Sequence, residues 1–271
     1  MMKYVNVNGI RLAYAIQGEG EPLVLITGLA YCSWFWHKVT PGLSEHFQVI
    51  TFDNRGAGDT DKPDGPYSIP MMAADTIGLM DALELREAYV LGHSLGGFIA
   101  QELAVTRPDL VSKLILASTN YGGTKIIPPT QEAIDVLTNR EGDPVELIRR
   151  GIAIACAPGF SEKNPAVANE LMAYRFQNRV PTQQYQAQVK AGLGMLEFSE
   201  EQVSERMARI QVPVLLLFGE YDEVVPPGNA ALMADKLPNA EVKILPAAGH
   251  LFPIERPEAT VAAIREFLES K

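Results

Sequence analysis

The sequence has few cysteines, few positive charges and no long hydrophobic run. Its two cysteines, Cys32 and Cys156, are too few for a disulfide framework or for the set of about four ligands in a structural zinc site. Lys and Arg total 23 against 33 Asp and Glu, and this net charge of −10 argues against nucleic acid and anionic membranes as partners. No apolar run reaches the ~18 residues that span a bilayer, and the first residues lack the apolar core of a signal peptide. We therefore expect a cytoplasmic protein without a metal site.

Short apolar segments that alternate with helical patterns are abundant. Hydrophobic residues make up 47% of the chain, enough to form the core of one large domain. Runs rich in Val, Ile and Leu that lack a polar face are typical of central strands in a parallel sheet. Around Asn8-Gly9, two alternating runs instead predict an antiparallel hairpin. The expected strands cover residues 22–27, 47–52, 88–91, 113–117, 212–218 and 240–245, and the helical patterns cover residues 70–85, 97–107 and 257–268.

The alternation stops between about Tyr121 and Ile210, where most of the sequence is compatible with helix. We interpret this stretch as a helical insertion between two strands of the sheet. The predicted organisation is a core of residues 1–121 and 210–271 and a cap of residues 122–209. The sequence carries no indication of the oligomeric state.

The clearest motif joins the strand that ends near Leu91 to the helix that follows it. Residues Gly92 to Gly97 read Gly-His-Ser-Leu-Gly-Gly, which is the pattern G-x-S-x-G. Glycines allow the chain to turn back sharply there, so that the Ser94 hydroxyl is exposed, and the start of the helix favours negative charge beside it. The pattern indicates a serine nucleophile, and the alternative is a tight turn with an incidental serine.

A serine nucleophile needs a base, and the order expected after such a motif is an acid followed by a histidine. Of the four histidines, only His250 follows the motif, just past the last predicted strand. Three carboxylates, those of Glu220, Asp222 and Glu223, follow the strand before it. Because parallel strands end at one edge of a sheet, we expect Ser94, His250 and one of these carboxylates to lie together.

These features resemble the α/β-hydrolase superfamily with a helical cap, and the resemblance covers nearly the whole chain. Residues Asp53 to Pro63 look like the family's D-x-R-G-x-G-x-[ST]-x-x-P loop, which has a structural role there. The resemblance implies an α/β-hydrolase fold, which is a mostly parallel eight-stranded sheet flanked by helices, with the cap inserted. The family pattern G-x-x-D, starting at Gly219, selects Asp222 as the acid of a Ser-His-Asp triad.

The resemblance also implies an oxyanion hole. The loop after the third predicted strand, where the family commonly has His-Gly, reads Thr27-Gly28-Leu29-Ala30. By position, the backbone N–H groups of Leu29 and Leu95 would bind the oxyanion. Thr27 in place of histidine leaves these donors intact and leaves open how the loop is braced.

The implied function is hydrolysis of a carboxylic ester or lactone of a small molecule through an acyl-enzyme, with no cofactor. Residues 63–69 and 94–97 are similar to those of 3-oxoadipate enol-lactonases. Two alternatives remain. One is a cofactor-free perhydrolase, haloperoxidase or lyase with the same triad, and the other is a receptor that turns its ligand over slowly.

The substrate pocket is expected from the large side chains near the site. For each of them, ordinary packing or a solvated helix face is the alternative. Arg175 lies one helical turn from Arg179, so the two could meet a carboxylate on the substrate. The candidate pocket residues are Trp36, Met172, Arg175, Phe176, Tyr185 and Met195.

Overall fold

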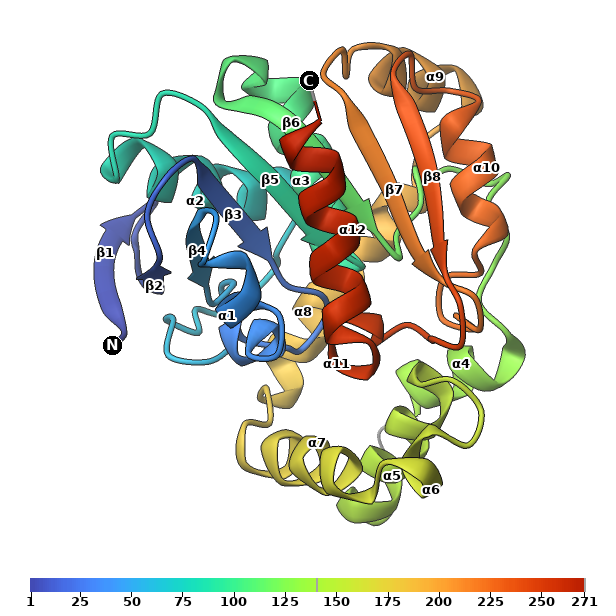
Figure 1. Ribbon diagram of the computed structural model, residues 1–271. Helices are drawn as coiled ribbons and strands as arrows, with labels where there is room; N and C mark the ends of the chain where they lie inside the picture. The colour runs from blue at the N-terminus through green and yellow to red at the C-terminus, as the bar shows by residue number, and fades with distance from the viewer. Residues whose placement is uncertain (140, 271) are drawn as a thin grey trace.

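The computed structural model describes residues 1–139 and 141–270 as an eight-stranded sheet with helices on both faces (Figure 1). The strands are β1 (Lys3–Val7), β2 (Ile10–Gln17), β3 (Pro22–Ile26), β4 (Gln48–Phe52), β5 (Ala88–His93), β6 (Val111–Ala117), β7 (Val214–Gly219) and β8 (Ala240–Leu245). Across the sheet they follow the order β1-β2-β4-β3-β5-β6-β7-β8.

The sheet is antiparallel at one edge and parallel elsewhere. β1 and β2 form the predicted hairpin, in which Asn8 and Gly9 have φ angles of 47° and 76°. β2 pairs antiparallel with β4, and every later pair in the strand order is parallel. The loops that follow β3, β5, β7 and β8 therefore lie together at the carboxyl-terminal ends of the parallel strands.

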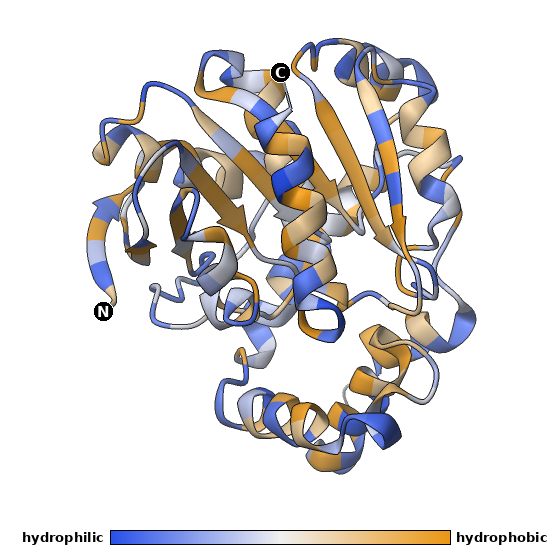
Figure 2. Cartoon of the chain, in the orientation of Figure 1, coloured by the Kyte–Doolittle hydropathy of each residue, from blue (hydrophilic) through white to orange (hydrophobic). Residues whose placement is uncertain are grey.

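Helices cover both faces of the sheet, because its central strands are apolar on both sides. They are α1 (Thr40–Leu43), α2 (Ile69–Ala82), α3 (Leu95–Thr106), α10 (Gly228–Ala234), α11 (Phe252–Glu255) and α12 (Pro257–Glu269), with the short turns η1 (Ser33–Trp36) and η2 (Pro108–Leu110). In β3, Val24 and Ile26 belong to one core cluster, and Leu23 and Leu25 belong to another. Figure 1 shows α12 in front of the sheet and α2 and α3 behind it, and Figure 2 shows β7 hydrophobic almost throughout.

Between β6 and β7 the chain leaves the sheet and forms a helical insert. Its elements are α4 (Gln131–Thr138), α5 (Pro144–Ala155), α6 (Phe160–Lys163), α7 (Pro165–Gln177), α8 (Thr182–Leu193), η3 (Gly194–Glu197) and α9 (Glu200–Ala208). Figure 1 shows α5, α6 and α7 beyond the ends of the strands and α9 back near α10. α9 packs on the core through Val203 and Met207, and its Arg206 pairs with Glu102 of α3.

The mostly parallel sheet and its helical insert confirm the fold class that the sequence predicts. Within residues 1–139 and 141–270, no helix has both the length and the apolar character needed to cross a membrane.

Candidate active site

Ser94 lies at the sharp turn between β5 and α3. Its backbone angles, φ 55° and ψ −120°, are strained for a residue with a side chain, as in a nucleophile elbow. Two glycines make this turn possible. A Cβ atom at Gly92 would collide with the Gly96 carbonyl, and one at Gly96 would lie 2.7 Å from the Thr27 carbonyl oxygen. The turn is therefore too closely packed for side chains at either position.

His250, in the loop after β8, pairs with Asp222, in the loop after β7. The Nδ1 atom of His250 lies 2.9 Å from Oδ2 and 3.1 Å from Oδ1 of Asp222, and both side chains are buried. Since an ionised carboxylate only accepts hydrogen bonds, Nδ1 is the donor in this contact, and Nε2 is the ring nitrogen that is not bound to the carboxylate. The backbone N–H groups of Val224 and Val225 fix Asp222 by donating to Oδ1 at 2.9 and 2.8 Å.

The other two carboxylates considered from the sequence point elsewhere. Glu220 accepts a hydrogen bond from the backbone N–H of Ala247, and Glu223 accepts one from the hydroxyl of Thr130. Asp222 is the member of the three that bonds to the histidine. Across the described residues, no three His, Cys, Asp or Glu side chains are grouped so that they could hold a metal ion.

Ser94 and His250 both line one cavity, and His93 connects their two loops. Nε2 of the buried His93 donates to the His250 carbonyl oxygen at 2.8 Å. Burial, and then the neighbouring His250, hold the pKa of His93 well below its ordinary value, so His93 is neutral. In the part of the chain that the structure describes, no hydrogen bond joins the Ser94 and His250 side chains. Such bonds often tighten only when substrate is present.

Glu255 joins the histidine loop to the insert. Its carboxylate accepts hydrogen bonds from the backbone N–H groups of Gly249, at 2.9 Å, and Ala157, at 2.7 Å. Burial raises its pKa to about 7, and the charge of Asp222 acts in the same direction. Sequence reasoning missed this residue, since its only signal is a single acidic residue after the apolar run 251–254.

The loop after β3 lies against the nucleophile turn. A Cβ atom at Gly28 would lie 2.9 Å from the Ser94 Cβ, so glycine is what lets this loop approach the serine. Leu29, one of the two predicted oxyanion donors, lines the cavity. Leu95, the other, is the first residue of α3. Leu29 and Leu95, the two predicted donors, therefore lie near Ser94, Leu29 in the loop after β3 and Leu95 directly after the serine in the chain.

Thr27 braces this loop from the core side, where the family commonly has histidine. Its hydroxyl donates to the Tyr31 carbonyl oxygen at 3.2 Å. Its own carbonyl oxygen accepts from Nδ2 of Asn54 at 3.0 Å. The threonine thus closes the loop on itself and ties it to the neighbouring strand end.

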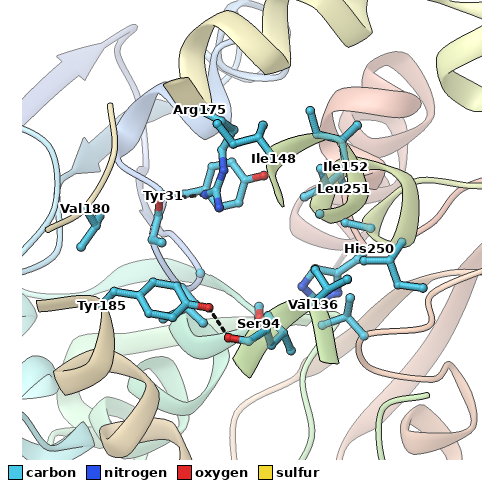
Figure 3. Close-up of a pocket in the computed structure, with 18 of the residues that line it drawn as sticks. Tyr31, Ser94, Val136, Ile148, Ile152, Arg175, Val180, Tyr185, His250 and Leu251 are labelled. Carbon is cyan, nitrogen blue, oxygen red and sulfur yellow. Dashed lines mark hydrogen bonds between the residues drawn. The ribbon is translucent and has the colours of Figure 1, made fainter. Parts of the chain in front are cut away.

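The cavity beside Ser94 has a volume of about 170 Å³ and mostly apolar walls. Figure 3 shows the side chains of Arg175 and Tyr31 on the opposite side of the cavity from Ser94 in this view. Arg175 and Arg179 lie on the wall, and none of the described wall residues is acidic. The apolar wall residues that the insert contributes include Val136, Leu147, Ile148, Ile152 and Val180.

Two of the predicted pocket residues, Arg175 and Tyr185, line the cavity. The cavity wall does not include Trp36, Met172, Phe176 or Met195. Trp36 is only 1% exposed, because it packs edge-on against His93 within the core. Phe176 is 55% exposed on α7, so it faces away from the site. Helical spacing identifies residues that share a face, but it does not identify what that face meets.

This fold and this geometry are those of an α/β hydrolase. A family model described as alpha/beta hydrolase fold matches residues 21–257, and the chain belongs to this family. The chain is 32% identical to BpoC of Mycobacterium tuberculosis, which is named as a non-heme bromoperoxidase, over 96% of this chain and 98% of that protein.

Two solved structures extend the comparison. An enol-lactonase from Burkholderia xenovorans LB400 is 25% identical and superposes with a TM-score of 0.81, covering 99% of this chain and 100% of that one. A thermophilic esterase from Thermogutta terrifontis is 27% identical with a TM-score of 0.80, covering 99% and 98% of the two chains.

Proposed function

We propose that the protein is a serine hydrolase that cleaves a carboxylic ester or lactone of a small molecule. The observation that carries this proposal is the Asp222–His250 pair at the cavity where Ser94 sits on its strained turn. A histidine whose Nδ1–H is bound to a carboxylate presents Nε2 as the base that activates a serine hydroxyl. The likeness to an enol-lactonase and an esterase supports the same class of reaction.

The reaction proceeds through an acyl-enzyme. Nε2 of His250 accepts the Ser94 proton while Oγ bonds to the substrate carbonyl carbon, whose π electrons move to the oxygen. Asp222 orients the imidazole and stabilises its charged form. Collapse of the tetrahedral intermediate breaks the bond to the alcohol, which takes the proton from His250. A water molecule gives a proton to Nε2 of His250 and attacks the acyl-serine carbonyl carbon. Collapse of this second tetrahedral intermediate breaks the bond to Ser94 Oγ, which takes the proton back from His250 as the acid leaves.

The negative charge on the tetrahedral oxygen requires hydrogen-bond donors. The backbone N–H groups of Leu29 and Leu95 fill this role, and each such donor stabilises the transition state by roughly 3–4 kcal/mol. The N-terminal end of α3 at Leu95 also favours negative charge. The nucleophile of the first step, the base and the oxyanion donors of this mechanism all belong to the chain, and the second nucleophile is water.

The cavity supports a small substrate with an acidic group. Its volume of about 170 Å³ is below the range of about 300–1,000 Å³ for drug-sized ligands, which favours short acyl groups. Arg175 is half-buried on a wall without a described acidic residue, so a carboxylate on the substrate would find a cation there.

The test is a panel of p-nitrophenyl esters of increasing acyl length, simple lactones and carboxylate-bearing enol-lactones, with Ser94→Ala as the control. We expect kcat/KM to be highest for short acyl groups. Removal of the nucleophile should lower kcat by roughly 10⁴-fold or more. Hydrolysis at the wild-type rate by purified Ser94→Ala protein would refute the proposal.

A second candidate is perhydrolysis, which the 32% identity to BpoC favours. Hydrogen peroxide would take the place of water, attack the acyl-serine and leave as a peracid that oxidises bromide. Bromination of a phenol dye in acetate and peroxide, compared with ester hydrolysis by the same preparation, separates the two activities. A bromination rate above the hydrolysis rate, and dependent on Ser94, would make perhydrolysis the main function.

A further inference from the structure

Side chains of the insert bind both backbone polar groups of Ala30, the residue that follows Leu29. The Ala30 N–H donates to Oε1 of Gln188 at 3.0 Å, and the Ala30 carbonyl oxygen accepts from Nη1 of Arg175 at 3.0 Å. Ala30 has a φ of 60°, which lies in the left-handed region that residues with a side chain disfavour. These two contacts therefore act on a residue whose backbone would otherwise prefer another conformation.

Gln188 is itself fixed by burial and by a second hydrogen bond. It is 1% exposed, and its Nε2 donates to the Arg55 carbonyl oxygen at 3.0 Å. Arg55 is in turn fixed by a buried ion pair with Asp75, in which Nη2 lies 2.6 Å from Oδ1. Both ends of the Gln188 amide are thus used, and each end contacts a different loop of the core.

The same helix also touches the second proposed oxyanion donor. A Cβ atom at Gly192, one turn after Gln188 on α8, would lie 3.1 Å from Cδ1 of Leu95. α8 therefore reaches the loop after β3 and the start of α3 together. Thr27 and Asn54 hold the chain before Leu29, and Gln188 holds it immediately after.

We propose that Gln188 is a positioning residue for the oxyanion hole. It keeps Ala30 in the left-handed conformation and thereby keeps the Leu29 N–H aimed at the tetrahedral oxygen. The insert then contributes to the rate of the reaction as well as to the shape of the cavity. This inference rests on the proposed serine hydrolase function.

The chain offers a matched control on the same helix. Gln184, one turn before Gln188, is also buried, and its Nε2 donates to the carbonyl oxygens of Lys62 and Pro63 at 3.2 and 3.3 Å. Gln184 therefore docks α8 on the core without a hydrogen bond to the loop after β3. Methionine is close to glutamine in length and lacks the amide, so Gln188→Met and Gln184→Met remove comparable bonds.

The experiment measures kcat and KM for p-nitrophenyl acetate, and inhibition by a trifluoromethyl ketone that forms a tetrahedral adduct with serine. We expect Gln188→Met to lower kcat by 10- to 100-fold while KM stays within about threefold of wild type. The inhibition constant of the ketone should rise by a factor similar to the loss in kcat. Gln184→Met should keep kcat within about threefold, although both variants lower the thermal midpoint. Equal losses of kcat in the two variants would overturn the proposal.

Substitution of Ala30 tests whether Gln188 acts through that residue. Glycine adopts the left-handed conformation without penalty, so adding Ala30→Gly to Gln188→Met should recover kcat by about fivefold. No recovery would contradict the mechanism. If Gln188→Met does not fold, Gln188→Glu replaces it, because its carboxylate still accepts from the Ala30 N–H. This variant should keep kcat within about fivefold, and a 100-fold loss in the folded protein would also contradict the proposal.

Ser94→Ala distinguishes failure of the proposed function from failure of the proposed role of Gln188. Activity that survives in Ser94→Ala refutes the proposed function itself. Activity that requires Ser94 but is unchanged in Gln188→Met refutes only the positioning role of Gln188.

Discussion

At the scale of single residues, the two oxygens of Asp222 have different surroundings. Oδ1 accepts from two backbone N–H groups, those of Val224 and Val225, whereas Oδ2 is the oxygen nearer to Nδ1 of His250. The loop after β7 therefore fixes which oxygen faces the histidine. An asparagine at this position has the same shape as aspartate but a different set of hydrogen-bonding groups, and the loop would hold it in the same orientation.

Asp222→Asn should lower kcat by roughly 10²- to 10⁴-fold with little loss of stability. The asparagine oxygen would take the place of Oδ1, and its NH₂ group would face His250. Nδ1 would then have to accept a hydrogen bond, which leaves the proton on Nε2, where the Ser94 proton should go. The pH-rate profile and kcat for a short p-nitrophenyl ester check this. A kcat within tenfold of wild type would argue against a triad role for Asp222.

Site residues that belong to short sequence motifs could be predicted from the sequence. Residues whose role depends on a contact with a distant part of the chain could not. The glycines around Ser94 and the position of His250 after the last strand are visible in the sequence. Gln188 lies 158 residues from its partner Ala30, and Glu255 lies 98 residues from Ala157. Such pairs depend on how the insert docks on the core, which no local pattern contains.

At the scale of elements, the turn from β5 to α3 depends on backbone contacts that leave no room for side chains. A Cβ atom at Gly96 would collide with the carbonyl oxygens of Ile26, the last residue of β3, and of Thr27, which follows it. The approach of α3 to β3 therefore positions the serine and the loop after β3 relative to each other.

Gly96→Ala should strongly reduce the yield of folded protein or abolish activity, because its Cβ would push α3 away from β3. Gly194→Ala is the matched control, since nothing lies within 4 Å of a Cβ there and its φ is −58°. That control should be neutral or slightly stabilising. Soluble yield, thermal midpoint and kcat are measured for the two variants. Equal values for Gly96→Ala and Gly194→Ala would contradict the predicted collision at position 96.

The elements of the insert show where prediction from periodicity ends. In α7, Arg175 lines the cavity, whereas its neighbour Phe176 faces solvent. Most of the apolar wall comes instead from α4 and α5, through residues such as Val136 and Ile152. An amphipathic pattern reveals that a helix has an apolar face, and the docking of that helix decides what the face covers.

At the scale of the whole molecule, the fold could be predicted almost entirely, because strand and helix patterns alternate clearly along the core. The junction between core and insert could not. Glu255 lies at that junction, where it binds the N–H groups of Gly249 and Ala157, and a further hydrogen bond joins Leu251 N–H to the Ala155 carbonyl oxygen at 2.9 Å. The histidine loop is therefore packed against the end of α5.

Glu255 should make the stability of the protein depend on pH. Burial raises its pKa from 4.5 to about 7, so between these values the native state holds a proton that the unfolded chain has released. The free energy of unfolding should therefore fall as the pH rises through this window, by up to about 3 kcal/mol. Glu255→Gln lacks this proton and should lose that part of the slope.

Urea unfolding of wild type and Glu255→Gln at pH 5 and pH 8 measures this effect. The change in the free energy of unfolding from pH 5 to pH 8 is then compared between wild type and Glu255→Gln. Other groups also titrate, such as Asp75, whose pKa is raised by burial. They contribute equally to the two proteins, so their effects cancel in this comparison. Parallel pH dependence in the two proteins would show that Glu255 does not titrate in this window.

Different helices of the insert line the cavity and contact the loops of the core, and this separation bears on how substrate preference can change by mutation. Val136, Ile148 and Ile152 shape the cavity from α4 and α5, whereas Gln188 reaches the core loops from α8. Mutations in the first group can alter which substrate fits the cavity while the hydrogen bonds around Ala30 stay in place. We therefore expect a library randomised at positions 136, 148 and 152 to change substrate preference without disturbing the contacts of Gln188.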